Sequence, residues 1–229
     1  MRYRSLQLRF TPALVLTMTL IGLSGCASAK SRAATTPTTV GGTISCAYSP
    51  TGQQAARSVG KPPTRASQLG TSIATLTTNQ GAIVIKLDAA KAPCTVNSFV
   101  YLAKAKYFDA TPCHRLTTAG IFVLQCGDPT GTGSGGPGYE FADENLSGAV
   151  YPAGTVAMAN AGPGTNGSQF FLVYADTTLA PNYTPFGTIT GGLSVIQKIA
   201  AAGSNNSNGQ GDGKPNLPVE ITNVTVASS

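Results

Sequence analysis

The sequence predicts a mainly β fold, a closed β-barrel capped by two α-helices. Three observations support this. The chain has 27 glycines and 15 prolines among 229 residues, which indicates many turns. Hydrophobic residues make up 41% and charged residues only 10%, which excludes a solvated disordered chain and disfavours long helices with charged faces. Short β-rich runs also outnumber helical patterns along the chain, as in a barrel built from many short strands.

The individual elements follow from local patterns, taken in chain order. Two β-rich runs, Thr71–Thr78 and Ala82–Leu87, are separated by the turn signal Asn79-Gln80-Gly81 and predict a hairpin. Apolar side chains at helical spacing predict an amphipathic helix of about three turns after Pro93 and a second helix over Leu193–Ala202. The remaining strand candidates are Cys113–Thr117, Ile121–Gln125, Thr155–Ala159, Gln169–Val173, Phe186–Thr190 and Pro218–Ala227.

The first 25 residues are predicted to be an export signal. Three arginines within the first nine residues precede an apolar run from Ala13 to Leu23, which is too short to cross a bilayer as a helix. The segment Leu23-Ser24-Gly25-Cys26 resembles a bacterial lipobox, in which the cysteine receives a diacylglycerol and becomes the acylated first residue. We therefore expect an exported protein, anchored by lipid at Cys26 to the extracytoplasmic face of the cell membrane. The alternative is an ordinary export signal with a cysteine at this point.

Residues 26–68 are predicted to be a flexible linker that begins with the lipidated cysteine. They are rich in Ala, Thr, Ser and Pro and show no apolar period of a strand or a helix. Cys46 is the one point at which this linker could be tied down. Residues 69–229 are then expected to form a single domain, large enough to bury a full core and monomeric.

Four cysteines remain once the lipidation site is set aside. An even number of thiols in an exported chain predicts two disulfides, and all three possible pairings stay open. A metal site is disfavoured because the chain has no Cys-x-x-Cys pair and its single histidine is His114. The four cysteines are Cys46, Cys94, Cys113 and Cys126.

Charge and motif patterns argue against nucleic-acid and nucleotide partners. The net charge is +6, but three of the positive charges lie in the export signal, and the remaining balance is too weak for a nucleic-acid surface. The segment Gly131–Gly136 matches G-x-G-x-x-G, which in a dinucleotide site opens a helix. Here Pro137-Gly138-Tyr139 follows, so we interpret the segment as a glycine loop.

Several sequence blocks, in order, resemble the cyclophilin family from about residue 70 to the end of the chain. They are far more specific than a short motif, and the chain is identified as a member of this family in a bacterial, actinobacterial-like lipoprotein form. The resemblance implies a peptidyl-prolyl cis–trans isomerase with an eight-stranded antiparallel barrel, two capping helices and no cofactor or metal. The blocks are Cys113-His-Arg115, Phe122 to Gly131, Gly135 to Tyr139, Phe141 to Asn145, Met158 to Phe171, and Phe186-Gly187.

The resemblance also assigns catalytic roles that fit the chemistry. Rotation about an Xaa-Pro bond is opposed by amide resonance, with a barrier of about 20 kcal/mol, and no bond is broken. The reaction therefore needs a donor aimed at the prolyl nitrogen and an apolar socket for the ring, which stabilise the twisted amide. Arg115 is the implied donor, and Gln125 holds it by a hydrogen bond across adjacent strands. Phe122 and Phe171 are the implied walls of the socket, and Val123 replaces the methionine usual in the family.

Further residues are assigned to substrate binding. Ala159 and Asn160 are expected to offer backbone groups to an extended peptide, although Asn160 could equally be a turn residue. Gln169 is expected to bond the carbonyl beside the proline. Leu179 and Tyr183 stand where the family has a Trp-Leu pair and a histidine. Because the chain has no Trp, we expect weak binding of the inhibitor cyclosporin.

Two interpretations remain beside this assignment. Strand alternation points the side chain of His114 away from Arg115, so His114 is left outside the site. The activity itself has an alternative from a different class, a non-catalytic proline-peptide-binding or chaperone module of the cell envelope. The expected partners in either case are proline-containing segments of exported or envelope proteins.

Overall fold

The computed structural model describes residues 39–40, 43–66 and 71–228. The predicted export signal, the predicted lipidation site Cys26 and the first part of the predicted linker lie outside the described residues. Within the described ranges, no helix combines the length and the hydropathy needed to cross a membrane.

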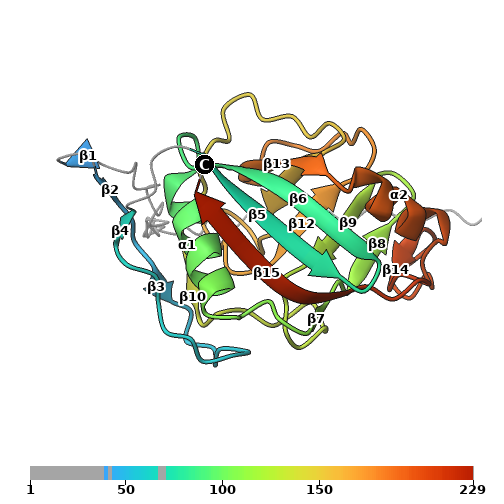
Figure 1. The fold of residues 1–229 in the computed structure, drawn as a ribbon, viewed down its shortest axis with the longest axis horizontal. Coiled ribbons are helices and arrows are strands. Elements are labelled where there is room, and N and C mark those ends of the chain that lie inside the picture. The colour runs from blue at the N-terminus through green and yellow to red at the C-terminus, as the bar shows by residue number, and fades with distance from the viewer. Residues whose placement is uncertain (1–38, 41–42, 67–70, 229) are drawn as a thin grey trace, which may run out of the picture. The chain divides into compact units, whose positions relative to one another are not determined.

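Ten strands of the described chain form one curled antiparallel sheet (Figure 1). The predicted hairpin is confirmed: β5 (Thr71–Thr78) and β6 (Gly81–Asp88) pair over their full length. In sheet order the strands are β14 (Asp212–Gly213), β8 (Arg115–Thr117), β9 (Val123–Cys126), β12 (Phe170–Val173), β11 (Thr155–Met158), β13 (Pro185–Gly191), β6 (Gly81–Asp88), β5 (Thr71–Thr78), β15 (Glu220–Ser228) and β7 (Thr111–Pro112).

The predicted closed eight-stranded barrel is not confirmed, because the sheet is open. Strands β14 and β7 form its two edges, and they do not pair with each other. Each of them is only two residues long, and Pro112 in β7 has no N–H to offer a further strand. The curled sheet therefore ends at both edges.

Two helices in the described residues pack on this sheet, as predicted. Helix α1 (Pro93–Lys104) begins with a proline. A backbone N–H at this position would have no intrahelical partner, so the lack of one in proline costs no hydrogen bond. Helix α2 (Leu193–Ala201) buries Ile196 and Ile199. In Figure 1, α1 lies beside β15, and α2 lies toward the end of the molecule that holds β8 and β14.

Alternate strand residues and one face of α1 build the main core. In β6, Ile83, Ile85 and Leu87 are buried, and the residues between them are more exposed. Phe99 of α1 meets Phe170 of β12 edge to face, with ring centroids 5.6 Å apart. The strands that carry the candidate site residues thus rest on a packed aromatic core.

Both predicted disulfides are present, and the structure selects one of the three pairings. Cys46 is joined to Cys94 in the first turn of α1, and Cys113 is joined to Cys126 at the end of β9. The second bridge ties together the two segments that carry Arg115 and its strand neighbour Gln125.

Residues 43–66, which the sequence places in a flexible linker, instead pack along α1 as a strap. Cys46, Tyr48 and Ala66 of the strap are buried in the main core. The difference arises because contacts with the rest of the domain hold the strap. The strap's own sequence has no apolar period from which these contacts could be predicted. Its strands are β2 (Thr43–Ser45), β3 (Ser49–Pro50) and β4 (Arg65–Ala66); β2 pairs with β4 and with the preceding β1 (Thr39–Val40), and β3 pairs with β10 (Tyr139–Glu140).

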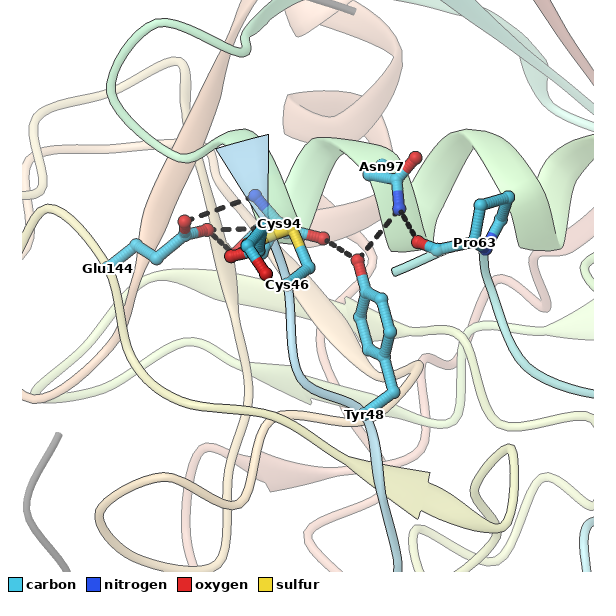
Figure 2. Close-up of a disulfide and its surroundings, with 8 residues drawn as sticks. Cys46, Tyr48, Pro63, Cys94, Asn97 and Glu144 are labelled. Atoms are coloured by element: carbon cyan, nitrogen blue, oxygen red, sulfur yellow. Dashed lines mark hydrogen bonds between the residues drawn. A yellow bond between two sulfur atoms is a disulfide. The ribbon is translucent and has the colours of Figure 1, made fainter. Parts of the chain in front are cut away.

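Buried hydrogen bonds around the first disulfide fasten the strap to α1 (Figure 2). The Tyr48 hydroxyl donates to the carbonyl oxygen of Cys94 at 2.7 Å. The Asn97 amide donates to the Tyr48 hydroxyl and to the carbonyl oxygen of Pro63, both at 2.9 Å. One helix side chain therefore holds both passages of the strap.

The N-terminus of α1 is capped by Glu144, which lies on a distant loop. Ala92, at the N-cap position, has no capping side chain. The buried Glu144 carboxylate instead accepts hydrogen bonds from the backbone N–H groups of Cys94 and Thr95 at 3.1 and 2.8 Å (Figure 2). A carboxylate at this position complements the positive end of the helix dipole.

Candidate functional site

Arg115, Gln125 and Phe171 lie abreast on three neighbouring strands. Arg115 is directly opposite Gln125 in the β8–β9 pair, and Gln125 is directly opposite Phe171 in the β9–β12 pair. Directly paired residues of antiparallel strands project from the same face of the sheet. The structure therefore brings together the predicted donor, its predicted holder and one predicted wall of the socket.

The predicted hydrogen bond between Arg115 and Gln125 is present. Nη1 of Arg115 donates to Oε1 of Gln125 at 3.3 Å. The Gln125 amide nitrogen in turn donates to Oε1 of Gln169 at 2.8 Å. A line of polar side chains thus runs from Arg115 along the row of strands.

Asp212 is the strongest partner of Arg115, and the sequence did not predict it. Its carboxylate accepts hydrogen bonds from Nε and Nη2 of Arg115 at 2.8 and 2.6 Å, a bidentate ion pair. This bonding raises the pKa of Arg115 and lowers that of Asp212. Asp212 follows Arg115 by 97 residues in a Gly- and Asn-rich segment, so no local pattern links the two.

The guanidinium of Arg115 keeps donors for a ligand. Of its five N–H groups, three are used by Asp212 and Gln125 within the described part of the chain. The two others belong to Nη1 and Nη2. The Arg115 side chain is 35% exposed, so a peptide lying on the sheet can reach it.

A small apolar cluster beside this polar line is separate from the main core. It contains Val123 and Phe171, both buried, with Leu179 and Tyr183 half-buried against them. The rings of Phe171 and Tyr183 meet edge to face at 5.5 Å. The buried Tyr151 hydroxyl donates to the carbonyl oxygen of Tyr183 at 2.8 Å and so fixes that segment. This cluster offers the apolar surface that a proline ring requires.

Phe122 is not part of this cluster. It precedes β9 by one residue, so its side chain and that of Val123 point to opposite faces. Phe122 is half-buried against the main core, with its ring 6.0 Å from that of Tyr174. The structure therefore places Phe171 and Val123 in the small cluster and Phe122 against the main core.

The other predicted binding residues take mixed positions. The backbone N–H of Ala159 already donates to the carbonyl oxygen of Gln169 at 3.0 Å. The Asn160 side chain builds a turn, because it accepts from the backbone N–H of Gly162 at 3.2 Å and donates to the carbonyl oxygen of Asn182 at 2.8 Å. The Asn160 side chain therefore lies in a turn, and the backbone N–H of Ala159 is already bonded within the described chain.

Asp128 fixes the conformation of the glycine loop by accepting backbone hydrogen bonds. The Asp128 carboxylate accepts from the backbone N–H groups of Thr130, Gly133 and Gly135 at 2.8 to 3.0 Å, and no helix begins there. The Gln169 amide donates to the carbonyl oxygens of Gly133 and Gly135 at 2.9 and 3.0 Å. Gln169 thus joins the loop to the line of polar side chains that begins at Arg115.

His114 lies against this loop. A methyl group added at Gly133 would stand 3.4 Å from Cδ2 of His114. Burial is the largest influence on His114 and lowers its pKa, which favours the neutral ring at pH 7. In the described ranges, no three His, Cys, Asp or Glu side chains are grouped so that they could hold a metal ion.

The sequence of this chain is similar to those of known proteins. Residues 73–226 match the family model "Cyclophilin type peptidyl-prolyl cis-trans isomerase/CLD". The chain is 48% identical over 198 residues to the probable peptidyl-prolyl cis-trans isomerase B of Mycobacterium tuberculosis, which covers 78% of this chain and 63% of the relative. It is 40% identical over 178 residues to peptidyl-prolyl cis-trans isomerase A of the same organism, covering 70% and 95%.

A solved structure of a protein of this type is similar to this chain as well. The crystal structure of a cyclophilin type peptidyl-prolyl cis-trans isomerase from Cryptosporidium parvum matches with a TM-score of 0.62 and 30% identity, covering 70% of this chain and 99% of that one. The chain spans slightly less than two thirds of the isomerase B relative, and it covers 95% of the isomerase A relative. The family model covers more than half of the chain. This chain belongs to the cyclophilin-type peptidyl-prolyl cis–trans isomerase family.

Proposed function

We propose that the domain catalyses rotation about Xaa-Pro bonds, with Arg115 as the donor to the prolyl nitrogen. The observation that carries the proposal is the fixed guanidinium, held by Asp212 and Gln125 in the row that ends at Phe171. As the amide twists, its nitrogen regains a lone pair and becomes a better hydrogen-bond acceptor. A donor that is already in place stabilises this twisted state more than the planar one, which lowers the barrier.

The apolar cluster around Phe171 holds the ring while the amide turns. Val123, Leu179 and Tyr183 pack with Phe171, and together they offer the proline ring an apolar surface. In this mechanism no proton is transferred and no covalent intermediate forms. Catalysis consists of gripping the proline and presenting one charged donor to its nitrogen.

A protease-coupled assay of prolyl isomerisation on the full chain tests the proposal. The wild type should accelerate the cis-to-trans conversion of an Xaa-Pro peptide. Peptide binding without acceleration would instead identify a proline-peptide-binding module.

We predict that Asp212 acts through Arg115. Replacing Asp212 with alanine leaves the guanidinium with Gln125 as its only partner among the described side chains, so kcat/KM should fall about three- to tenfold with no change in fold. Because pairing lowers the pKa of Asp212, its carboxylate stays ionised from neutral to mildly acidic pH, and wild-type activity should fall only below the ordinary aspartate pKa of about 3.9. Asp88→Asn is the control, since the ion pair that Asp88 forms within the described chain is with Lys91 at the surface. Equal activities of wild type and Asp212→Ala would contradict the role.

We further propose that the protein is exported and held at the membrane by a lipid on Cys26. The lipobox-like segment and the two disulfides support this, because disulfides persist in oxidising compartments. In a bacterial host the full chain should partition with membranes, and Cys26→Ser should abolish lipid labelling. Several acyl chains hold a protein firmly, whereas one binds marginally. Wild-type protein in the soluble fraction, without lipid, would rule the anchor out.

A further inference from the structure

An open cleft of about 480 Å³ lies next to the candidate active site. Gln125 and Gln169 border it, and Gln125 is paired directly with Phe171. Gln169 lies two residues before Phe171, about 7 Å along an extended chain. A peptide advances by about 3.3 Å per residue, so a proline on Phe171 would place the side chain two or three residues away in the cleft.

One wall of the cleft is supplied by the strap. Thr51, Gln53 and Gln54 line it, together with Ala159 and Asn160. The side chains of Gln53 and Gln54 are exposed, as substrate-contacting groups must be. These residues lie outside residues 73–226, which match the family model, so this wall is formed by a segment outside the matched part of the chain.

Backbone hydrogen bonds clamp this part of the strap on both sides. Before the two glutamines, the N–H of Thr51 donates to the carbonyl oxygen of Gly138 at 3.2 Å. After them, the N–H of Ala56 donates to the carbonyl oxygen of Gly136 at 2.8 Å. Strand β3 also pairs with β10, directly beside the glycine loop. The two glutamines are therefore presented from a short loop with both ends fixed.

The strap is fixed at two distant points as well. Cys46 is bonded to Cys94 at the start of α1. Arg57 donates to backbone carbonyl oxygens of the loop that follows α1, including that of Tyr107 at 3.0 Å. The wall is thus anchored at both ends of the helix, and a wall held in this way can select a ligand by shape and hydrogen bonding.

The chemistry of the cleft favours a neutral, hydrogen-bonding side chain. Its lining carries the amides of Gln53, Gln54, Gln125 and Gln169 together with backbone groups of the glycine loop. Among the described residues, its lining contains one carboxylate, Glu140. The lining offers few apolar side chains for a large hydrophobic residue.

We propose that Gln53 and Gln54 of the strap are specificity-determining residues. They select substrates that carry an amide or hydroxyl side chain two or three residues from the isomerised proline. This rests on the proposed isomerase function, since it assigns the neighbouring subsite of the same cleft. The strap then has two roles: it stabilises α1, and it contributes to substrate specificity.

The test compares the wild-type full chain with the Gln53→Ala/Gln54→Ala variant on matched peptides. The peptides differ only at the positions two and three residues before and after proline, and these positions carry either Gln or Ala. For wild type, kcat/KM should be about three- to tenfold higher with Gln than with Ala, which is the size of one neutral hydrogen bond. In the double variant the Gln-to-Ala ratio should approach one. Gln80→Ala, on the β5–β6 turn, is the control and should keep the wild-type ratio.

Peptide affinities measured by calorimetry on the same set separate the two proposals. Selective binding by wild type that is lost in the double variant, without any acceleration of isomerisation, would overturn the isomerase function and support the subsite. A wild type that does not discriminate among the peptides, or a folded double variant that keeps the full Gln preference in rate and affinity, would overturn the subsite.

Discussion

Removing the Cys46–Cys94 disulfide is expected to lower the free energy of unfolding by about 4 kcal/mol. The bridge closes a loop with a sequence separation of 48, and a loop of this length restricts the unfolded chain by about that amount. In the folded protein both cysteines are buried, at 4% and 8% exposure, and the strap around them packs in the main core. Opening the bridge therefore adds freedom mainly to the unfolded state.

The measurement is denaturant unfolding of the full chain, comparing wild type with the Cys46→Ser/Cys94→Ser variant, which leaves no single thiol from this pair. The Cys113→Ser/Cys126→Ser variant is the matched control. Its loop has a sequence separation of only 13, so the expected loss is about 3 kcal/mol. A loss below about 1 kcal/mol for the first pair would mean that the strap is held by its other contacts alone.

The strap shows why part of the fold could not be predicted from the sequence. Its two passages are held by Asn97, and Tyr48 packs edge to face on Tyr139 and Phe141, both with ring centroids 5.5 Å away. None of these partners is near in sequence. A segment that is stabilised by single anchors leaves no apolar period, and by composition it matches a flexible linker.

The hairpin and both helices could be predicted because their signals are local. Alternation along β6 and the helical spacing after Pro93 each lie within one element. Closure of the sheet is a different matter, because it depends on whether β14 and β7 meet, and these lie 100 residues apart in the chain. Local patterns describe strands well but carry little information on the edges of a sheet.

The candidate site divides in the same way. Arg115, Gln125 and Phe171 could be found because they lie in recognisable sequence blocks, and strand pairing then aligns them. Asp212 could not, because its only signal is the need of a half-buried guanidinium for a counter-ion. Phe122 belongs to the same sequence block as Gln125, but its side chain packs against the main core, and the block itself does not indicate this packing.

Replacing Arg115 with alanine is expected to lower kcat/KM at least about tenfold, which is 1.4 kcal/mol of transition-state stabilisation. The loss arises because no other cation in the described ranges lies in the row formed by Gln125 and Phe171. Arg115→Lys should recover little of the activity, since an ammonium cannot form the paired bonds to Asp212 that orient the guanidinium. The fold should persist, because the side chain is partly exposed and the Cys113–Cys126 bridge stays in place.

The double variant Arg115→Ala/Asp212→Ala removes the carboxylate that the single Arg115 variant leaves without its partner. If Asp212 acts only by orienting Arg115, the double variant should be no slower than Arg115→Ala alone, so the two losses should not add. Additive losses would indicate a separate role for Asp212.

The most direct test is exchange spectroscopy by NMR on an Xaa-Pro peptide, which reports the catalysed rate between the cis and trans forms at equilibrium. The full chain should accelerate this exchange without any added metal or cofactor. Arg115→Ala, with its unfolding transition unchanged, should reduce the catalysed rate at least about tenfold. A folded Arg115→Ala variant that exchanges the peptide at the wild-type rate would contradict the assignment of Arg115 as the donor to the prolyl nitrogen.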